Sequence, residues 1–333
     1  MTSGQYSYII EETSEALPLY WKGLVNNMKK MQLGITPLQV SPIALGCMRI
    51  GAKSQKEIQA LVEKALELGI NYMDHADIYS WGKNSEEMFG ELLKEKPSLR
   101  EQMYIQTKCG ICGGYYDSSK EHILESVDNS LRKMNLDKID VLMIHRPDAL
   151  MEPEEVAEAF HILKDSGKVD YFGVSNMNPM QIQLIEKYTG MKMVADQVQF
   201  NVVHSGMVDE GIFVNMKDDG AIMRTGNLIE YAMLHEMTLQ AWSVLMASWA
   251  DGSYIGHPKY ASVNEKLQEL ADVYGVSKNA IALAWILRHP CKIQAIAGTT
   301  SVQHLEELCK GAEIQLTRKQ WYELYLSNGK QLP

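Results

Sequence analysis

The chain has 333 residues, of which 46% are hydrophobic and 22% charged, and its formal net charge at pH 7 is −10. This is the balance of an ordinary globular protein, so it excludes a disordered, collagen-like or coiled-coil chain as the main theme. The longest apolar run, residues 280–287, is far shorter than the roughly 20 residues needed to span a bilayer. Since no stretch is strongly basic either, we expect neither nucleic acid nor a membrane as a partner.

The cysteine content and the N-terminus both bear on where the protein works. Five cysteines, an odd number in a long chain, do not predict a disulfide framework. The N-terminus shows no basic or apolar signal region, so the sequence predicts a cytoplasmic protein with free thiols. Residues 1–27 lack a clear period, and Met28 resembles an ordinary start. We therefore expect an N-terminal extension over 1–27, inside or outside the fold, and a single domain over 28–333.

Beyond residue 42, short apolar or β-branched runs alternate with stretches of helical spacing. In chain order, the predicted strand and helix pairs are 43–45 with 56–68, 71–73 with 85–93, 103–105 with 119–133, 139–144 with 154–165, 171–174 with 179–187, 193–195 with 227–234, 238–241 with 264–274, and 293–296 with 303–310. An extra helix is predicted over 278–287 and a last one over 317–326.

Eight such units between residues 43 and 310 predict an α/β protein, a closed (β/α)8 TIM barrel rather than an open, doubly wound sheet. Before them, residues 32–34 and 38–40 flank a short turn, which predicts a β-hairpin that plugs the bottom of the barrel. The last helix would follow the closed barrel. The irregular stretch 245–263, which contains two glycines and a proline, is a candidate lid loop.

In such a barrel the functional residues lie at the carboxyl ends of the strands. Most predicted strands end in side chains or backbone groups that donate, accept or stack: Asp74, Lys108, His145, Ser175, Asn176, Gln197, Trp242, Ser243, Gly298, Thr299 and Thr300. Lys108 is the most informative, because an unpaired charge in a barrel mouth is costly and requires a nearby acid, which Asp74 supplies. Tyr79, His145 and Trp242 taken singly also fit structural roles, so the prediction depends on their convergence.

Several of these residues stand in motifs of one known family. Asp74-x4-Tyr79, the Lys108 strand end and the segment around His145 resemble the Asp/Tyr/Lys/His tetrad of the aldo-keto reductases. Further segments follow in that family's order: Gly173-Val174-Ser175-Asn176, Asp196-Gln197, Ala241-Trp242-Ser243 and Ala297-Gly298-Thr299-Thr300. The resemblance covers about residues 33–308 and is closest to the bacterial general oxidoreductases of that family.

The resemblance implies an NADPH-dependent oxidoreductase that reduces aldehydes or ketones to alcohols by hydride transfer. Tyr79 would be the general acid, and His145 would hydrogen-bond the carbonyl oxygen and place it. Lys108 would lower the pKa of the Tyr79 phenol, which is near 10 when free, and Asp74 would keep Lys108 charged and oriented.

The resemblance also implies a cofactor site. Ser175, Asn176 and Gln197 would hold the nicotinamide carboxamide, and Trp242, followed by Ser243, would stack on the ring. A phosphate would lie at the start of the next helix, held by Gly298, Thr299, Thr300, Ser301 and His304. No Gly-x-Gly-x-x-Gly occurs, so a Rossmann fold is not the source of dinucleotide binding.

Three departures from the family pattern concern the choice of cofactor. The last segment lacks the Lys or Arg that commonly grips the 2′-phosphate of NADP. Leu308 occupies a position that is often Asn, and Val244 replaces a common Pro. We therefore expect NADP as cofactor with shallow selectivity, and NAD as the alternative.

Cys109 and Cys112 form a Cys-x-x-Cys motif, a spacing found in redox and zinc sites. No second pair completes a tetrahedral site, so we interpret them as incidental thiols beside Lys108 and predict no metal.

Two other functions stay open. One is a metal-dependent barrel hydrolase or lyase using Asp74, His75, Asp77 and His145, although the first strand lacks His-x-His. The other is a non-catalytic NADP-binding barrel subunit, against which an intact tetrad argues. The sequence indicates a small-molecule carbonyl substrate without naming it, and leaves monomer and homo-oligomer both open. The loops predicted to line its pocket are 117–119, 201–222 and 248–260.

Overall fold

The computed structural model describes residues 28–333, and the expected extension over residues 1–27 lies outside the described residues. Eight parallel strands form a closed barrel: β3 (Ile43–Gly46), β4 (Tyr72–Asp74), β5 (Tyr104–Cys109), β6 (Ile139–Ile144), β7 (Val169–Ser175), β8 (Ala195–Gln199), β9 (Thr238–Trp242) and β12 (Gln294–Ala297). Each strand pairs with its neighbour in the chain, and β12 closes the ring between β9 and β3. The predicted (β/α)8 barrel is confirmed.

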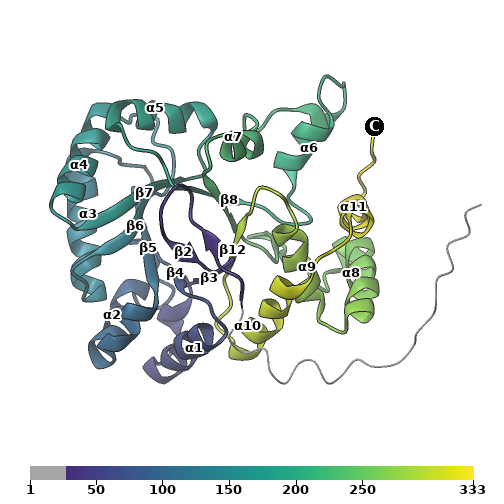
Figure 1. Ribbon diagram of the computed structural model, residues 1–333, viewed down its shortest axis with the longest axis horizontal. Helices are drawn as coiled ribbons and strands as arrows, with labels where there is room; N and C mark the ends of the chain where they lie inside the picture. The colour runs from purple at the N-terminus through teal and green to yellow at the C-terminus, as the bar shows by residue number, and fades with distance from the viewer. Residues whose placement is uncertain (1–27) are drawn as a thin grey trace, which may run out of the picture.

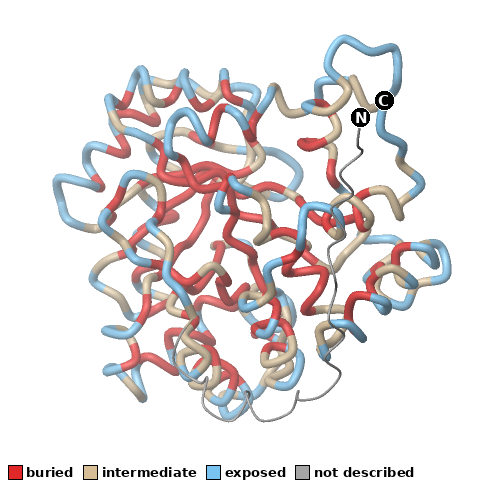
Figure 2. The backbone as a smooth tube through the Cα atoms, turned by 45° about the vertical axis from the view of Figure 1, so that its right-hand side comes forward, coloured by how far each residue is buried: buried red, intermediate tan, exposed pale blue. Residues whose placement is uncertain are grey.

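The helices surround this barrel, with α8 and α11 on the opposite side from α3 and α4 (Figure 1). They are α1 (Gln55–Glu67), α2 (Ser85–Glu95), α3 (Lys120–Met134), α4 (Pro153–Asp165), α5 (Pro179–Thr189), α6 (Gly206–Ile212), α7 (Leu228–Leu234), α8 (Ala261–Tyr274), α9 (Lys278–Leu287), α10 (Val302–Cys309) and α11 (Arg318–Ser327). Burial is concentrated in the strands and on the inner faces of the helices (Figure 2). The extra helix and the last helix were both predicted.

Local sequence explains where many helices begin. Ser54 and Glu57 form a reciprocal capping box at the start of α1, as Thr317 and Gln320 do at the start of α11. α9 is apolar almost all round, and each of its residues from Ala280 to Ile286 is accordingly buried. Capping and burial thus account for the start of these helices and for their packing on the barrel.

The N-terminal hairpin occupies the bottom of the barrel, as predicted. Its strands β1 (Met31–Gln32) and β2 (Gln39–Val40) are antiparallel, and Leu33 and Val40 belong to the apolar cluster of the barrel interior. Gly34 has φ +52°, and a Cβ there would lie 2.5 Å from the Val194 carbonyl oxygen, so the close approach requires glycine. The hairpin closes the end of the barrel opposite the strands' carboxyl ends.

Three predicted segments need correction. The strand expected over 193–195 instead spans Ala195–Gln199. The prediction placed it too early because the polar residues Asp196, Gln197 and Gln199 do not resemble a buried strand. The stretch 245–263, expected to be irregular, contains a hairpin of β10 (Met246–Ser248) and β11 (Gly252–Ser253). α6 lies within 201–222, where only a loop was predicted.

Among residues 28–333, no single helix is long and apolar enough to cross a membrane; one pair, Pro258–Tyr274 with Lys278–Leu287, passes that test together but is bent by 93°.

Candidate active site

Asp74, Lys108 and Tyr79 form a continuous chain of contacts at the carboxyl ends of β4 and β5. Lys108 Nζ donates to Asp74 Oδ1 at 2.7 Å and to the His75 carbonyl at 2.8 Å. It also donates to the Tyr79 hydroxyl at 3.2 Å. Lys108 is fully buried and Asp74 is 2% exposed, so the ion pair is shielded from water. The predicted acid partner of Lys108 is therefore present.

His145 completes the predicted tetrad. It follows β6, and its ring lies edge-on to that of Tyr79, with centroids 5.8 Å apart. Burial, with the positive charges of Lys108 and Arg146, holds the pKa of His145 well below its usual value. The imidazole is therefore neutral at pH 7 and offers one N–H donor and one acceptor.

The pKa of Tyr79 reflects two opposing effects. Burial raises it above the ordinary value of 10.0, and the Lys108 ammonium lowers it, as expected, but offsets only part of that rise. The net direction is upward because desolvation of the phenolate outweighs the attraction of the ammonium. Desolvation also works to lower the pKa of Lys108, but Asp74 and Tyr79 more than offset it, so the net shift is upward.

A buried glutamine network supports Asp74 from inside the barrel. Gln106 Nε2 donates to Asp74 Oδ1 at 2.6 Å, and Gln197 Nε2 donates to the same oxygen at 2.9 Å. Both amides also donate to Gln240 Oε1, and Gln240 in turn donates to Gln294 at 2.8 Å. One carboxylate oxygen thus accepts three hydrogen bonds, which stabilises its charge in a dry interior. Sequence reasoning missed this network.

Above the tetrad lies a cleft of about 820 Å³. Its lining includes most of the predicted site residues: Asp74, Tyr79, His145, Ser175, Asn176, Gln197, Trp242, Ser243, Gly298, Thr299 and His304. Lys108 lies beneath the surface, and Thr300 and Ser301 are not part of the lining. Ser301 instead caps α10, its hydroxyl accepting from the His304 N–H at 3.3 Å.

The nicotinamide-site candidates are hydrogen-bonded to one another. Trp242 Nε1 donates to Asn176 Oδ1 at 3.1 Å, and Asn176 Nδ2 donates to Ser175 Oγ at 2.6 Å. Ser175 Oγ donates to the Gln197 carbonyl at 2.8 Å. Asn176 and Ser243 have φ of +59° and +57°, a left-handed backbone that is uncommon for residues other than glycine.

Two arginines in the cleft wall were missed. Arg49 follows β3, and its guanidinium donates to the Gly298 carbonyl at 3.5 Å and lies over the Trp81 ring at 5.7 Å. Arg146 lies over the Trp242 ring at 5.8 Å. Neither has an ion-pair partner among the described residues. Arg49 is 249 residues from Gly298 in the chain, so no local signal pointed to it.

The residues of the alternative metal-dependent site do not converge. His75 packs on Phe89, with ring centroids 4.5 Å apart, and burial lowers the pKa of His75 to about 3. Burial, with the nearby Glu86 carboxylate, raises the pKa of Asp77 to about 7. In the part of the chain that the structure describes, the one group spaced to share an ion lies elsewhere, at Cys112, Asp117 and His122.

Comparison with known proteins gives the same answer as the geometry. The model of the aldo/keto reductase family matches residues 42–325. A 6-dehydroglucose reductase of Agrobacterium fabrum is 33% identical over 309 residues, which cover 89% of this chain and 97% of that protein. The oxidoreductase YdhF of Escherichia coli is 32% identical over 280 residues, covering 81% of this chain and 87% of that protein.

A solved structure agrees. The crystal structure of a thermostable aldo-keto reductase, Tm1743, in complex with the inhibitor epalrestat matches with a TM-score of 0.71 and 25% identity, covering 90% of this chain and 99% of the other. The chain therefore belongs to the aldo/keto reductase family and is an NAD(P)H-dependent carbonyl reductase.

Proposed function

We propose that the protein uses NADPH to reduce an aldehyde or a ketone, with Tyr79 as the general acid. The observation that carries this proposal is the contact chain from Asp74 through Lys108 to the Tyr79 hydroxyl, which opens into the same cleft as His145. A proton donor and a second hydrogen-bonding group thus face one point where a carbonyl oxygen can sit.

The nicotinamide, when bound, supplies the hydride. The protein itself supplies the proton and orients the substrate. Neutral His145 donates a hydrogen bond to the carbonyl oxygen and aims it at Tyr79. The Tyr79 hydroxyl gives its proton to that oxygen as negative charge develops there, and Lys108, 3.2 Å away, stabilises the phenolate left behind. Asp74 keeps the ammonium charged and in place.

The cleft suits a dinucleotide. Its volume of about 820 Å³ is in the range typical of ligand sites, roughly 300–1,000 Å³. A Cβ on Gly298 would meet nothing within 4 Å, so the backbone there is open to close approach. The side-chain amide nitrogen of Gln197 donates to Asp74 and Gln240, which leaves the side-chain oxygen Oε1 to accept from a carboxamide N–H. Ser175, Asn176 and Trp242 would complete the nicotinamide site, with Ser243 beside them.

Replacing Trp242 with Ala should weaken NADPH binding by about 2- to 12-fold, because an aromatic pair is worth roughly 0.5–1.5 kcal/mol beyond its buried area. Trp242→Phe is the matched control. It retains an aromatic face, although a smaller one, and loses the hydrogen bond from Nε1 to Asn176. Fluorescence titration of NADPH measures both. Equal loss in the two variants would assign the effect to the hydrogen bond and contradict stacking.

The end of the cleft that would hold the 2′-phosphate favours NADPH over NADH only modestly. Gly298, Thr299 and His304 line the cleft next to the start of α10, where backbone N–H groups attract an anion, with Thr300 and Ser301 beside them. Arg49 bonds Gly298 rather than α10 itself, so we assign it to the pyrophosphate that both cofactors share. We therefore expect NADPH to bind about tenfold more tightly than NADH, a difference of roughly 1.4 kcal/mol.

Titrating both nucleotides into wild type and Arg49→Met tests this assignment. The variant should weaken NADPH and NADH by the same factor and leave their ratio unchanged. A ratio that collapses in Arg49→Met would instead place the 2′-phosphate on Arg49. A wild-type preference for NADH would overturn the choice of cofactor.

The substrate is proposed as a small carbonyl compound, reduced in the cytoplasm. The cleft wall combines Trp249, Ile111 and Met246 with Arg146, which suits a partly polar ligand. A relative is named a 6-dehydroglucose reductase, so dehydro-sugars belong in the assay beside simple aldehydes and ketones. Consumption of NADPH with at least one carbonyl compound is expected. Cofactor binding without turnover of any of them would favour a non-catalytic binding subunit.

A further inference from the structure

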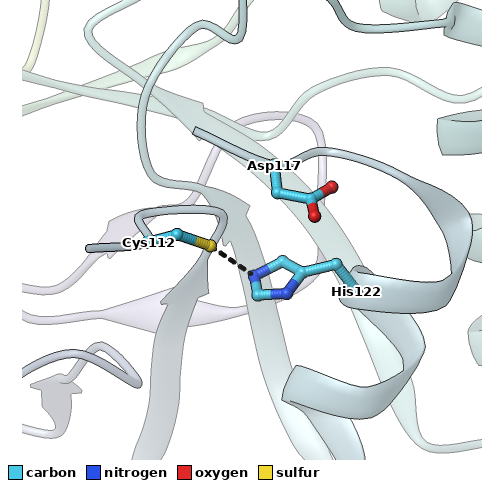
Figure 3. Close-up of side chains that lie close together, drawn as sticks. All are labelled: Cys112, Asp117 and His122. Atoms are coloured by element: carbon cyan, nitrogen blue, oxygen red, sulfur yellow. Dashed lines mark hydrogen bonds between the residues drawn. The ribbon is translucent and has the colours of Figure 1, made fainter. Parts of the chain in front are cut away.

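The loop after β5 and the first turn of α3 bring together three side chains that the catalytic site does not use. Cys112, Asp117 and His122 each offer one ligand atom, and these atoms all lie within 4.8 Å of one another. Cys112 Sγ is 3.8 Å from His122 Nε2, and the Asp117 carboxylate lies beside the His122 ring (Figure 3). All three side chains are half-buried, so the space between them is reachable from solvent.

The backbone holds these residues in place. Cys112 begins a tight turn in which its N–H donates to the Tyr115 carbonyl at 3.0 Å, and Gly114, at φ +98°, supplies the left-handed conformation. Asp117 N–H donates to the Gly110 carbonyl at 3.0 Å. His122 lies in the first turn of α3, where its N–H donates to the hydroxyl of the cap residue Ser119 at 3.3 Å.

We propose that Cys112, Asp117 and His122 form a binding site for Zn²⁺ or a similar divalent transition-metal ion, with water in the fourth position. Thiolate, imidazole and carboxylate are the ligands that zinc uses in proteins. Zinc–sulfur and zinc–nitrogen distances of about 2.3 and 2.0 Å at a tetrahedral angle separate sulfur and nitrogen by roughly 3.5 Å. The 3.8 Å between Sγ and Nε2 is close to that spacing.

The surrounding charges favour a cation. Asp117 Oδ1 accepts from the Ser119 N–H at 2.9 Å, but the carboxylate has no ion-pair partner within residues 28–333. The carboxylates of Asp117, Asp77 and Asp148 also act electrostatically on the Cys112 sulfur. This concentration of negative charge favours a bound divalent ion. Binding exchanges the thiol proton for the metal and releases that proton to solvent.

The Cys-x-x-Cys motif had paired Cys112 with Cys109 rather than with Asp117 and His122. Cys109, the other cysteine of the Cys-x-x-Cys motif, is buried at the end of β5 and does not belong to the group. The other two members of the group are Asp117 and His122, five and ten positions after Cys112. Ile111, next to Cys112, lines the active-site cleft, so a bound ion would fix the rim of that cleft to α3. The site itself does not depend on the proposed reaction.

Cobalt(II) chloride, titrated into the tag-free full chain, is the direct probe. Its thiolate complexes absorb in the near ultraviolet, and Cys112 is the one cysteine of the five that is not buried. Zinc chloride is then added to displace the cobalt. The variants are Cys112→Ser, His122→Asn and Asp117→Asn, and the control is His161→Asn, which removes an exposed histidine on α4. Circular dichroism confirms that each variant is folded.

We expect one cobalt ion per chain, a thiolate band in wild type and His161→Asn, and displacement by zinc. Loss of an outer-shell partner costs metal affinity about 10–100-fold, so loss of a direct ligand should cost at least tenfold. Cobalt binding without a thiolate band would overturn the proposal, as would wild-type affinity in folded Cys112→Ser or in both of the other ligand variants.

Discussion

Tyr79→Phe should reduce kcat by about 10²–10⁴ while NADPH binds with nearly wild-type affinity, since this is the range that general acid catalysis contributes. Phenylalanine retains the ring that lies edge-on to His145 and loses only the hydroxyl next to Lys108 Nζ. Because burial raises the pKa of Tyr79 above 10.0, the wild-type phenol is protonated at neutral pH. A general acid is lost as pH rises through its pKa, so we expect no loss of rate from Tyr79 ionisation near pH 7.

Steady-state rates on a good carbonyl substrate, with a parallel NADPH titration, measure this effect. Tyr116→Phe is the control, because Tyr116 is an exposed tyrosine on the loop after β5, outside the cleft lining. Full kcat in Tyr79→Phe would remove Tyr79 from the mechanism. A parallel loss of NADPH affinity would mean that the hydroxyl supports the cofactor site rather than proton transfer.

The barrel could be predicted because its signals are local. Each helix-forming stretch carries its own apolar period and often its own cap, as Ser54 and Glu57 show at α1. The residues of β4 before Asp74 are apolar, and Tyr104 and Ile105 begin the strand that leads to Lys108, so both charges could be placed near strand ends. The pairing of Asp74 with Lys108 follows in turn from the cost of burying either alone.

What could not be predicted depends on contacts that are distant in the chain. Gln106, Gln240 and Gln294 read as polar interruptions of their strands, and only the closed barrel brings their amides together. For the same reason the predicted position of β8 was too early in the chain, because its Asp196 and Gln197 are polar although they are buried. Trp249 was assigned to an irregular loop, but its ring stacks on Trp81 with centroids 6.4 Å apart and the planes 18° from parallel.

Lys108→Met should both abolish most activity and destabilise the fold by about 3–5 kcal/mol, the usual result of removing one partner from a buried ion pair. Lys108 Nζ bonds Asp74, the His75 carbonyl and Tyr79, and methionine replaces none of these bonds. Urea denaturation of wild type and variant measures the change in the free energy of unfolding. Lys120→Met, which removes an exposed ion pair with Glu158, should have a much smaller effect.

A second substitution separates stability from catalysis. In Lys108→Met/Asp74→Asn, the uncompensated charge is removed, and the amide oxygen of Asn can still accept from Gln106 and Gln197. A neutral replacement of a buried ion pair is often tolerated, so we expect most of the lost stability to return. Activity should stay as low as in the single variant, because no ammonium faces Tyr79 to stabilise the phenolate that proton transfer leaves. Recovery of kcat together with stability would show that Lys108 holds the fold and takes no part in the reaction.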